Sequence, residues 1–429
     1  MGKTMRRRVL FLTYHLPMPE EPGAFRPWME ARLIKNAGFE VTVVTCGTQY
    51  MTGKDIRPAR GWCTEEVTEG IRILKTWAPA DHRQSLFRRV LNYSSFSLLA
   101  GVASFLKAGK VDRVFAGTDP IFLMPMVFLI SLIKRAPMVL DERDLFPETA
   151  VALGVIRDGI LYRILLGMQN CFRRMSSGIL AATPGIKRVL LDYGCLPEKV
   201  QLLYNADVFF DEDLRKDESP ETLRKATGRE FLVGYAGGLG RANDIPVLLR
   251  AAALLNDLAD IGIVVMGSGE RQQIYKDYCR KNRLNNVSFF DAIPRKEARQ
   301  LLREMDVCIQ PLPRHPYFSR TLTSKTFDYH GLGKPMIFCG SGDTVALLED
   351  SGGGVVVEPE DEEALAQVLR KLHSDALLRL EMGASARRWF ETNVNVHAAS
   401  EIVKKAMNGQ QTASVRTRAS EGRLCRERR

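Results

Sequence analysis

The sequence predicts an α/β protein with two doubly wound, Rossmann-like domains that face each other across a cleft. The chain has 429 residues, more than one ordinary hydrophobic core supports, so two domains are expected. Short runs of β-branched and other apolar residues alternate with helix-length amphipathic segments, which is typical of parallel sheets joined by crossover helices. This alternation stops in a charged segment and begins again after it, which places a domain boundary inside the chain.

The first domain is expected to span residues 1–210. It opens with a buried strand, VLFLTY at 9–14, which leads through a loop with proline and glycine to an amphipathic helix and a second strand at 41–46. Residues 85–107 predict one long, mostly apolar helix. Further strands are expected in the segments IRILKTW, DRVFAG, PMVLD and GILAAT.

The second domain is expected at 231–388. A linker at 211–230 precedes it, and this linker should be solvated because it is charged and has almost no large apolar residues. Residues 389–408 are expected to form a helix that crosses back to the first domain, and 409–429 a basic, disordered tail. The strands of the second domain are expected in the segments FLVGYAG, IGIVVMG, VSFFDA, VCIQPL, PMIFCG and GVVVEP.

Composition excludes several classes of protein. Apolar residues make up 45% of the chain and charged residues 26%, as in soluble globular proteins. The eight cysteines form no CxxC pair and no cluster with histidine, which argues against a disulfide framework and a zinc site and favours a reducing compartment. The longest apolar run, at 121–133, is interrupted by a proline and is shorter than the roughly 20 residues that a membrane-spanning helix needs.

Charge is unevenly distributed along the chain. Residues 1–203 carry a net charge of +10, residues 204–408 one of −3, and the tail at 409–429 one of +4. A basic first half indicates contact with something anionic. No basic motif interleaved with aromatic residues supports nucleic acid as the partner, so an anionic membrane surface is the favoured one. The protein is therefore expected in the cytoplasm, peripherally bound to the inner face of the plasma membrane. The long apolar helix either enters the lipid interface or packs as a buried helix of its domain.

The segment TLTSKTFDYHGLGKPMI, at 321–337, suggests a nucleotide site. Ser324 and Lys325 stand at a predicted helix start, where free backbone N–H groups and the positive end of the helix dipole favour an anion. Asp328 follows one turn later on the same face, where its carboxylate could accept both hydroxyls of a ribose. The alternative is an ordinary capped helix with an exposed acid.

A glycine-rich turn follows the first strand of the second domain. The segment YAGGLGRAND places Gly237 and Gly238 between a strand and a helix, a suitable position for phosphate contacts from backbone N–H groups. It is not the dinucleotide-binding fingerprint, because Asn243 stands where the third glycine belongs. A tight turn without a ligand is the alternative.

The order and spacing of these motifs resemble a known family. The segments GYAGGLGRANDIPVLLRAA, VVMGSGERQQ, TLTSKTFDYHGLGKPMIF and GGGVVVEPEDEEALAQVL together are similar to the donor domain of the retaining glycosyltransferases of family 4. The segments RVLNYSSFSLLAG and VLDERDLFPETAVALG resemble a subgroup, the bacterial amino-sugar transferases of O-antigen and colanic-acid type. The resemblance covers roughly residues 8 to 408. It implies a GT-B fold and sugar transfer from a nucleotide-diphospho-sugar, expected to be UDP-linked, with retained anomeric configuration and without a metal or other cofactor.

The resemblance also implies site residues. Asp328 stands at the second glutamate of the family's paired-glutamate motif and is expected to hold the ribose hydroxyls. Ser324 and Lys325 are expected at the diphosphate, and Ile293, within a segment from Asp291 to Pro294, near the base. Four further donor-binding positions are expected: Gly23, Arg26, Gly237 and Gly238.

Three departures from the family pattern bear on catalysis. The first paired glutamate falls at Arg320, and the basic pair of many members falls on Gly238 and Asn243. Arg241 or Lys325 must then neutralise the leaving diphosphate. The catalytic-domain histidine of the family falls on Arg143, followed by Asp144. The catalytic candidates are accordingly Lys325, Arg241, Arg143 and Asp144.

The predicted function is transfer of a sugar, for example an N-acetylamino sugar, to a saccharide or polyprenol-linked saccharide acceptor in surface polysaccharide synthesis. Two alternatives stay open. One is a catalytically silent GT-B subunit that binds another transferase, and the missing basic pair favours it. The other is a nucleotide-sugar epimerase or hydrolase, which would need acid and base residues that the sparse histidines do not supply.

Overall fold

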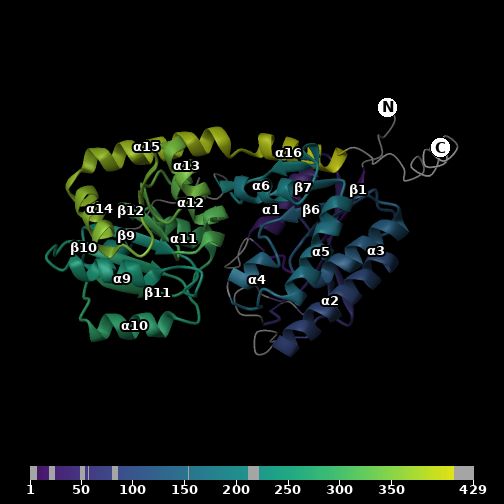
Figure 1. Ribbon diagram of the computed structural model, residues 1–429, viewed down its shortest axis with the longest axis horizontal. Coiled ribbons are helices and arrows are strands. Elements are labelled where there is room, and N and C mark those ends of the chain that lie inside the picture. Colours follow the sequence, from purple (N-terminus) through teal and green to yellow (C-terminus); the bar gives the residue numbers. More distant parts are fainter. Residues whose placement is uncertain are drawn as a thin grey trace, which may run out of the picture.

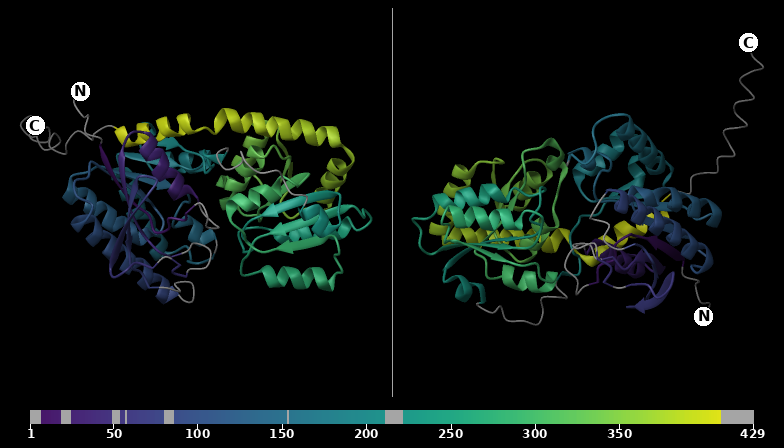
Figure 2. Two further views of the ribbon diagram at one scale, coloured as in Figure 1. Left: turned by 180° about the vertical axis from the view of Figure 1, so that it is seen from behind. Right: turned by 90° about the horizontal axis from the view of Figure 1, so that it is seen from below.

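The computed structural model describes residues 7–18, 25–48, 54–56, 58–79, 86–152, 154–210 and 222–409. It contains two sheets, each covered by helices, which lie side by side as two lobes (Figures 1 and 2). The prediction of an α/β fold with two mainly parallel sheets is confirmed.

The first sheet has eight strands in the order β3-β4-β2-β1-β5-β6-β7-β8, and every neighbouring pair is parallel except β3 and β4. The strands are β1 (Arg8–Leu12), β2 (Glu40–Cys46), β3 (Cys63–Thr68), β4 (Ile71–Thr76), β5 (Arg113–Gly117), β6 (Met138–Glu142), β7 (Gly178–Ala181) and β8 (Val200–Leu202). The helices of this lobe are α1 (Arg26–Asn36), α2 (Leu86–Leu106), α3 (Met124–Lys134), α4 (Glu148–Ala152), α5 (Ile160–Met175) and α6 (Pro184–Asp192).

Both faces of the first sheet are buried, which explains the continuous apolar runs of its strands. On β1, Leu10 and Leu12 belong to one hydrophobic cluster, while Val9 and Phe11 belong to a second cluster on the opposite face. The first cluster includes side chains of α2, α3 and α6, and the second includes side chains of α1. The two edge strands β3 and β8 were not predicted. On β3, buried or half-buried residues alternate with exposed ones in the manner of an edge strand, and β8 has only three residues.

The second sheet has six parallel strands in the order β11-β10-β9-β12-β13-β14. They are β9 (Phe231–Ala236), β10 (Ile261–Met266), β11 (Val287–Phe290), β12 (Val307–Pro311), β13 (Met336–Cys339) and β14 (Gly354–Val357). The helices are α8 (Thr222–Thr227), α9 (Ile245–Leu254), α10 (Gln272–Lys281), α11 (Arg295–Leu302), α12 (Ser324–Gly331), α13 (Asp343–Ser351), α14 (Glu362–Ser374) and α15 (Ala376–Asn393). Helix α8 lies within the predicted linker at 211–230, and its Leu223 is buried. The last three residues of this linker connect α8 to β9.

The last helix, α16 (Val396–Asn408), packs on α1, β7 and β8 of the first lobe, whereas α15 packs on α12 of the second (Figure 1). The contact between α16 and the sheet is close. A Cβ atom built at Gly178 would lie 2.4 Å from the carbonyl oxygen of Ala406, so only glycine fits there. Arg113 Nε donates a hydrogen bond of 2.7 Å to the carbonyl of Met407. The chain therefore returns to its first lobe at the end of the described residues.

The strand order reverses direction between β1 and β5 in the first sheet and between β9 and β12 in the second. Ligands of doubly wound folds bind at the carboxyl ends of the strands beside such a switch point. The loops after β5, β6, β9 and β12 are therefore the places to look for a site.

Candidate functional site

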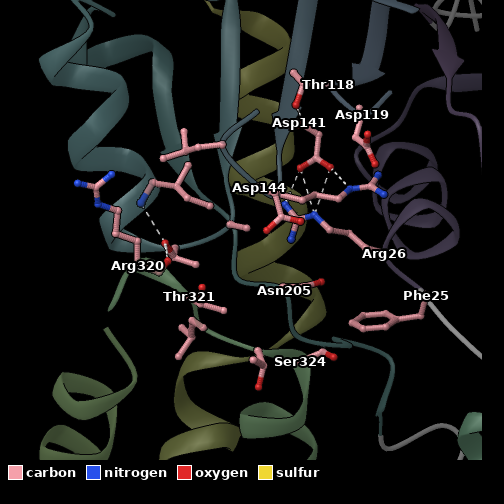
Figure 3. Close-up of a pocket in the computed structure, with 18 of the residues that line it drawn as sticks. Phe25, Arg26, Thr118, Asp119, Asp141, Asp144, Asn205, Arg320, Thr321 and Ser324 are labelled. Carbon is pink, nitrogen blue, oxygen red and sulfur yellow. Dashed lines mark hydrogen bonds and ion pairs between the residues drawn. The ribbon is translucent and has the colours of Figure 1, made fainter. Parts of the chain in front are cut away.

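A cavity of about 390 Å³ lies between the two lobes (Figure 3). Its first-lobe wall comes from residues just after β5, β6 and β7, and Thr118, Asp119 and Asp144 belong to it. Its second-lobe wall comes from Arg295 of α11, from residues 317 and 320–323 between β12 and α12, and from Ser324 and Lys325 at the start of α12. The cavity thus lies at the carboxyl ends of strands from both sheets.

A smaller cavity of about 200 Å³ adjoins it within the second lobe. Arg295, Ser324 and Lys325 line both cavities. The smaller cavity is also lined by four of the residues that the sequence predicted for the donor: Gly237, Gly238, Ile293 and Asp328. The structure therefore brings most of the predicted donor-binding residues together around one space.

The tip of α12 points to the place where the cavities meet. Thr323 is its N-cap residue, but the side chain of Thr323 accepts no capping hydrogen bond from the first N–H groups of the helix. Lys325 lies against the glycine turn, because a Cβ atom built at Gly237 would be 2.2 Å from Cε of Lys325. A larger residue at 237 would displace this lysine.

Lys325 is the cation of this tip. Its Nζ lies 5.5 Å from the centre of the Tyr235 ring, and within the described part of the chain it forms neither a hydrogen bond nor an ion pair. Burial lowers the pKa of Lys325 to about 8, partly offset by the attraction of Asp328. A buried ammonium without a carboxylate partner is a favourable place for an anion.

Asp328 is already engaged by arginines. Arg295 Nη2 lies 2.7 Å from Oδ1 and 2.9 Å from Oδ2 of Asp328, and Arg299 donates to Oδ1 from Nε at 3.2 Å and Nη2 at 3.0 Å. Arg299 also pairs with Asp207 at 2.8 Å. The carboxylate predicted to hold the ribose is thus part of an ion network, and ribose hydroxyls would have to share its oxygens with these arginines.

A second ion network supports the first-lobe wall. Arg26 is 2% exposed and pairs with Glu30 at 2.8 Å and with Asp141 at 2.7 Å. Its Nη1 also donates to the carbonyl oxygens of the two residues that follow β8, each at 3.0 Å. Arg143 joins the same carboxylates, with Asp141 at 2.5 Å and Glu30 at 3.1 Å. The guanidinium of Arg26 is therefore committed to the protein, and its contact with a donor stays a prediction.

Carboxylates of the first lobe face the larger cavity. Asp144, a predicted catalytic residue, accepts a hydrogen bond of 3.1 Å from the hydroxyl of Tyr317 in the second lobe. Asp119 accepts no hydrogen bond within the described residues. Withdrawal from bulk solvent, and then the neighbouring Asp144, raise the pKa of Asp119 to about 6. These groups can hold hydroxyls of a sugar.

Arg241 is not brought into the site. The side chain of Arg241 is 69% exposed and pairs with Glu270 at 3.3 Å, and it lines neither cavity. Gly23 lies outside the described residues. The catalytic role predicted for Arg241 stays a prediction that no contact supports.

The sequence reasoning missed Arg295, Arg299, Asp119 and Tyr317. The spacing of Arg295 and Arg299, four residues apart after a proline, could have placed both on one face of a helix. Asp119 and Tyr317 carry no such signal, because their position depends on how the two lobes meet.

The second lobe matches a known family model. Residues 230–375 fit the model described as "Glycosyl transferases group 1", and they include the glycine turn and α12. This segment is a group 1 glycosyltransferase domain. The predicted enzyme class is confirmed, and the protein is a glycosyltransferase.

A curated relative and several solved structures agree with this assignment. The glycosyltransferase is 24% identical over 307 residues to WbjE of Pseudomonas aeruginosa, which is described as a probable glycosyltransferase. The matched segment covers 68% of this chain and 74% of WbjE. Among solved structures, Anabaena HepE in complex with UDP-glucose superposes with a TM-score of 0.66 at 15% identity, over 94% of this chain and all of HepE. WaaG, a glycosyltransferase involved in lipopolysaccharide biosynthesis, gives a TM-score of 0.64 at 19% identity, over 94% of this chain and all of WaaG. Sucrose-phosphate synthase from Thermosynechococcus elongatus gives a TM-score of 0.71 at 14% identity, over 98% of this chain and 99% of the synthase. These similarities confirm the predicted GT-B fold.

Proposed function

We propose that this glycosyltransferase moves a sugar from a UDP-linked donor to a saccharide acceptor with retention of the anomeric configuration, as in family 4. The observation that carries the proposal is the meeting of two cavities at the tip of α12, where Lys325 forms no ion pair among the described residues. The HepE structures hold UDP-glucose and UDP, which supports the choice of UDP.

In this proposal the donor lies across both cavities. The base lies in the smaller cavity beside Ile293, the ribose near Asp328, and the diphosphate at the tip of α12. The transferred sugar then extends into the larger cavity. Base, ribose, diphosphate and sugar are thus placed in sequence from the smaller cavity, within the second lobe, to the larger cavity between the lobes.

The reaction requires charge stabilisation. The bond between the anomeric carbon and the diphosphate oxygen breaks, and its electron pair leaves with the UDP. The acceptor oxygen bonds to the anomeric carbon on the same face, and its proton passes to the departing diphosphate. Lys325 and the N–H groups of α12 stabilise the negative charge that develops, which is the kind of preorganised electrostatic effect that contributes most to many rate enhancements. These steps need no metal or other cofactor.

The acceptor is proposed to bind on the first-lobe wall. Asp119 and Asp144 offer oxygens to its hydroxyls, opposite the cations of the second lobe. A polyprenol-linked saccharide in surface polysaccharide synthesis is the proposed acceptor, and an N-acetylamino sugar the proposed transferred group. The description of WaaG as a lipopolysaccharide enzyme supports this context.

The nucleotide proposal is tested with a thermal-shift panel of UDP-, GDP-, ADP- and dTDP-sugars. A ligand that binds only the folded protein raises the unfolding temperature in proportion to its affinity, so UDP-sugars should give the largest rise. UDP should then be released from the best donor only when a saccharide acceptor is present. Release without an acceptor would indicate a hydrolase, and no release with any acceptor would favour a silent binding subunit.

The outer face of the first lobe fits a membrane surface. Helices α2, α3 and α5 pack side by side there (Figure 1), and each exposes large apolar side chains. No helix in the described part of the chain is long and apolar enough to cross a membrane. We call the surface formed by α2, α3 and α5 the apolar face. Its most exposed apolar residues are Phe87, Leu98, Leu106, Leu132, Ile133, Ile160, Leu161 and Ile164. Exposed arginines on the same helices include Arg88, Arg163 and Arg174.

Lipid contact through the apolar face predicts binding to vesicles. The protein should cosediment with vesicles that contain phosphatidylglycerol more than with vesicles of phosphatidylcholine alone, because the arginines attract anionic headgroups. Changing Leu132 and Ile133 to glutamate should remove most of this binding, since the side chains no longer enter the interface. Leu377→Glu, on the exposed surface of the second lobe, is the matched control and should bind as the wild type. Equal loss in both variants would argue against the apolar face as the contact.

A further inference from the structure

Arg295 occupies a central position between the lobes. It is the first residue of α11 and lines both cavities with Ser324 and Lys325. Its guanidinium carbon lies 3.7 Å from the centre of the Phe25 ring, which belongs to the first lobe. It is therefore next to the place proposed for the diphosphate and in contact with both lobes.

The hydrogen bonds of Arg295 are incomplete. Only its Nη2 atom reaches Asp328, at 2.7 and 2.9 Å from the two carboxylate oxygens. Its Nε is buried and has no hydrogen-bond partner within the described residues. A buried N–H without an acceptor is costly, so a polar ligand beside Arg295 would stabilise it.

The cluster around Arg295 has more cations than carboxylates. Arg299 is neutralised by Asp207 and shares Asp328 with Arg295. Lys325 has no carboxylate of its own, and besides burial the charge of Arg295 contributes to its lowered pKa. Three cations thus face two carboxylates, and the excess positive charge lies where Arg295 and Lys325 meet. An anion bound between these two residues would balance it.

We propose that Arg295 binds the diphosphate of the donor as the second cation beside Lys325. This inference rests on the proposed function. It gives Arg295 the role that the sequence assigned to Arg241, which lies outside both cavities. An arginine suits it, because the planar guanidinium forms paired hydrogen bonds to phosphate oxygens.

Binding of the diphosphate also affects Asp328. Nη2 of Arg295 reaches both oxygens of Asp328, and Arg299 holds Oδ1 independently. When Arg295 turns toward the phosphates, Oδ2 of Asp328 becomes available to a ribose hydroxyl. The diphosphate and the ribose are therefore recognised together, and Asp328 holds Arg295 near the site while the donor is absent.

The test compares UDP with uridine on Arg295→Gln. UDP affinity, measured by calorimetry, should fall about 10- to 100-fold, the loss expected for charge-assisted hydrogen bonds. Uridine affinity, measured by ligand-observed NMR, should not fall, since uridine has no phosphate and the loss of Arg295 leaves Oδ2 of Asp328 open to its ribose. Arg295→Lys keeps the charge without the paired geometry and should lie between the wild type and Arg295→Gln.

The controls separate this inference from the proposed function. Lys296→Gln, on the next and exposed residue of α11, should bind UDP as the wild type. If Arg295→Gln weakens uridine as much as UDP, or leaves UDP affinity unchanged, Arg295 only supports the fold and the inference fails while the function stands. If the wild type binds no UDP at all, both the inference about Arg295 and the proposed function fail. Unfolding curves without ligand check that each variant folds. If Arg295→Gln does not fold, UDP and uridine are compared on Arg295→Lys instead.

Discussion

Replacing Lys325 with alanine is expected to lower kcat for sugar transfer about 100- to 1000-fold, the loss seen when one preorganised donor to a developing charge is removed. Lys325 is the cation at the tip of α12 and forms no ion pair among the described residues, so its full charge is available to the departing diphosphate. The measurement is the steady-state rate of UDP release with a saturating saccharide acceptor.

Lys334→Ala is the matched control for this variant. Burial also lowers the pKa of Lys334, but this lysine follows α12 at its other end and lines neither of the two cavities. It should retain transfer activity. A comparable loss in both variants would mean that Lys325 acts through stability and not at the diphosphate.

The pH profile gives an independent check on Lys325. Because its pKa in the free protein is about 8, the ammonium is charged below this pH and neutral above it. kcat/KM of the wild type should therefore fall as the pH rises from 7 to 9, while Lys325→Ala should show no fall from this source. A wild-type profile that stays flat over this range would count against a catalytic ammonium at 325.

Replacing Asp141 with asparagine is expected to destabilise the protein by about 3–5 kcal/mol, the cost typical of removing one partner from a buried ion pair. Asp141 is fully buried and receives hydrogen bonds from Arg26 and Arg143. Burial raises its pKa, but the two arginines outweigh this and hold the pKa of Asp141 below its usual value. The variant removes the charge of one of the two carboxylates that Arg26 and Arg143 share and leaves Glu30 as the other. The free energy of unfolding is measured by denaturant titration.

Asp257→Asn is the control for the buried network. Asp257 also forms two short hydrogen bonds with one arginine, Arg370, but both side chains are exposed to water. Its replacement should change stability far less, because water solvates the charge that is left. Equal losses in the two variants would show that burial of the Asp141 network contributes little.

The order of strands and helices could be predicted because it depends on local sequence. The run at 9–14 overlaps β1, which spans Arg8–Leu12, and the apolar segment at 85–107 contains α2. The strand FLVGYAG was predicted correctly and is β9, and the structure places the glycine turn after it next to the start of α12. The edge strands β3 and β8 were missed because an edge strand carries a weaker apolar pattern than a central one.

The partners of the site residues could not be predicted. Asp328 was predicted to hold the ribose, and the arginine that binds it, Arg295, lies 33 residues earlier in the chain. Arg26 was expected at the donor, yet it is enclosed by Asp141 and Glu30. Arg295 and Asp141 are distant in sequence from the residues they bind and become their neighbours only through the packing of helices on the sheet, whereas Glu30 lies four residues after Arg26 on the same helix.

The sequence by itself determined the two α/β domains, the tip of α12 with Ser324 and Lys325, and the glycine turn, because periodicity, capping and turn chemistry act over a few neighbouring residues. Only the tertiary structure decided which charges remain unpaired at the junction of the lobes. The pairing of a charge depends on all groups within a few ångströms, and folding brings those groups together from both ends of the chain.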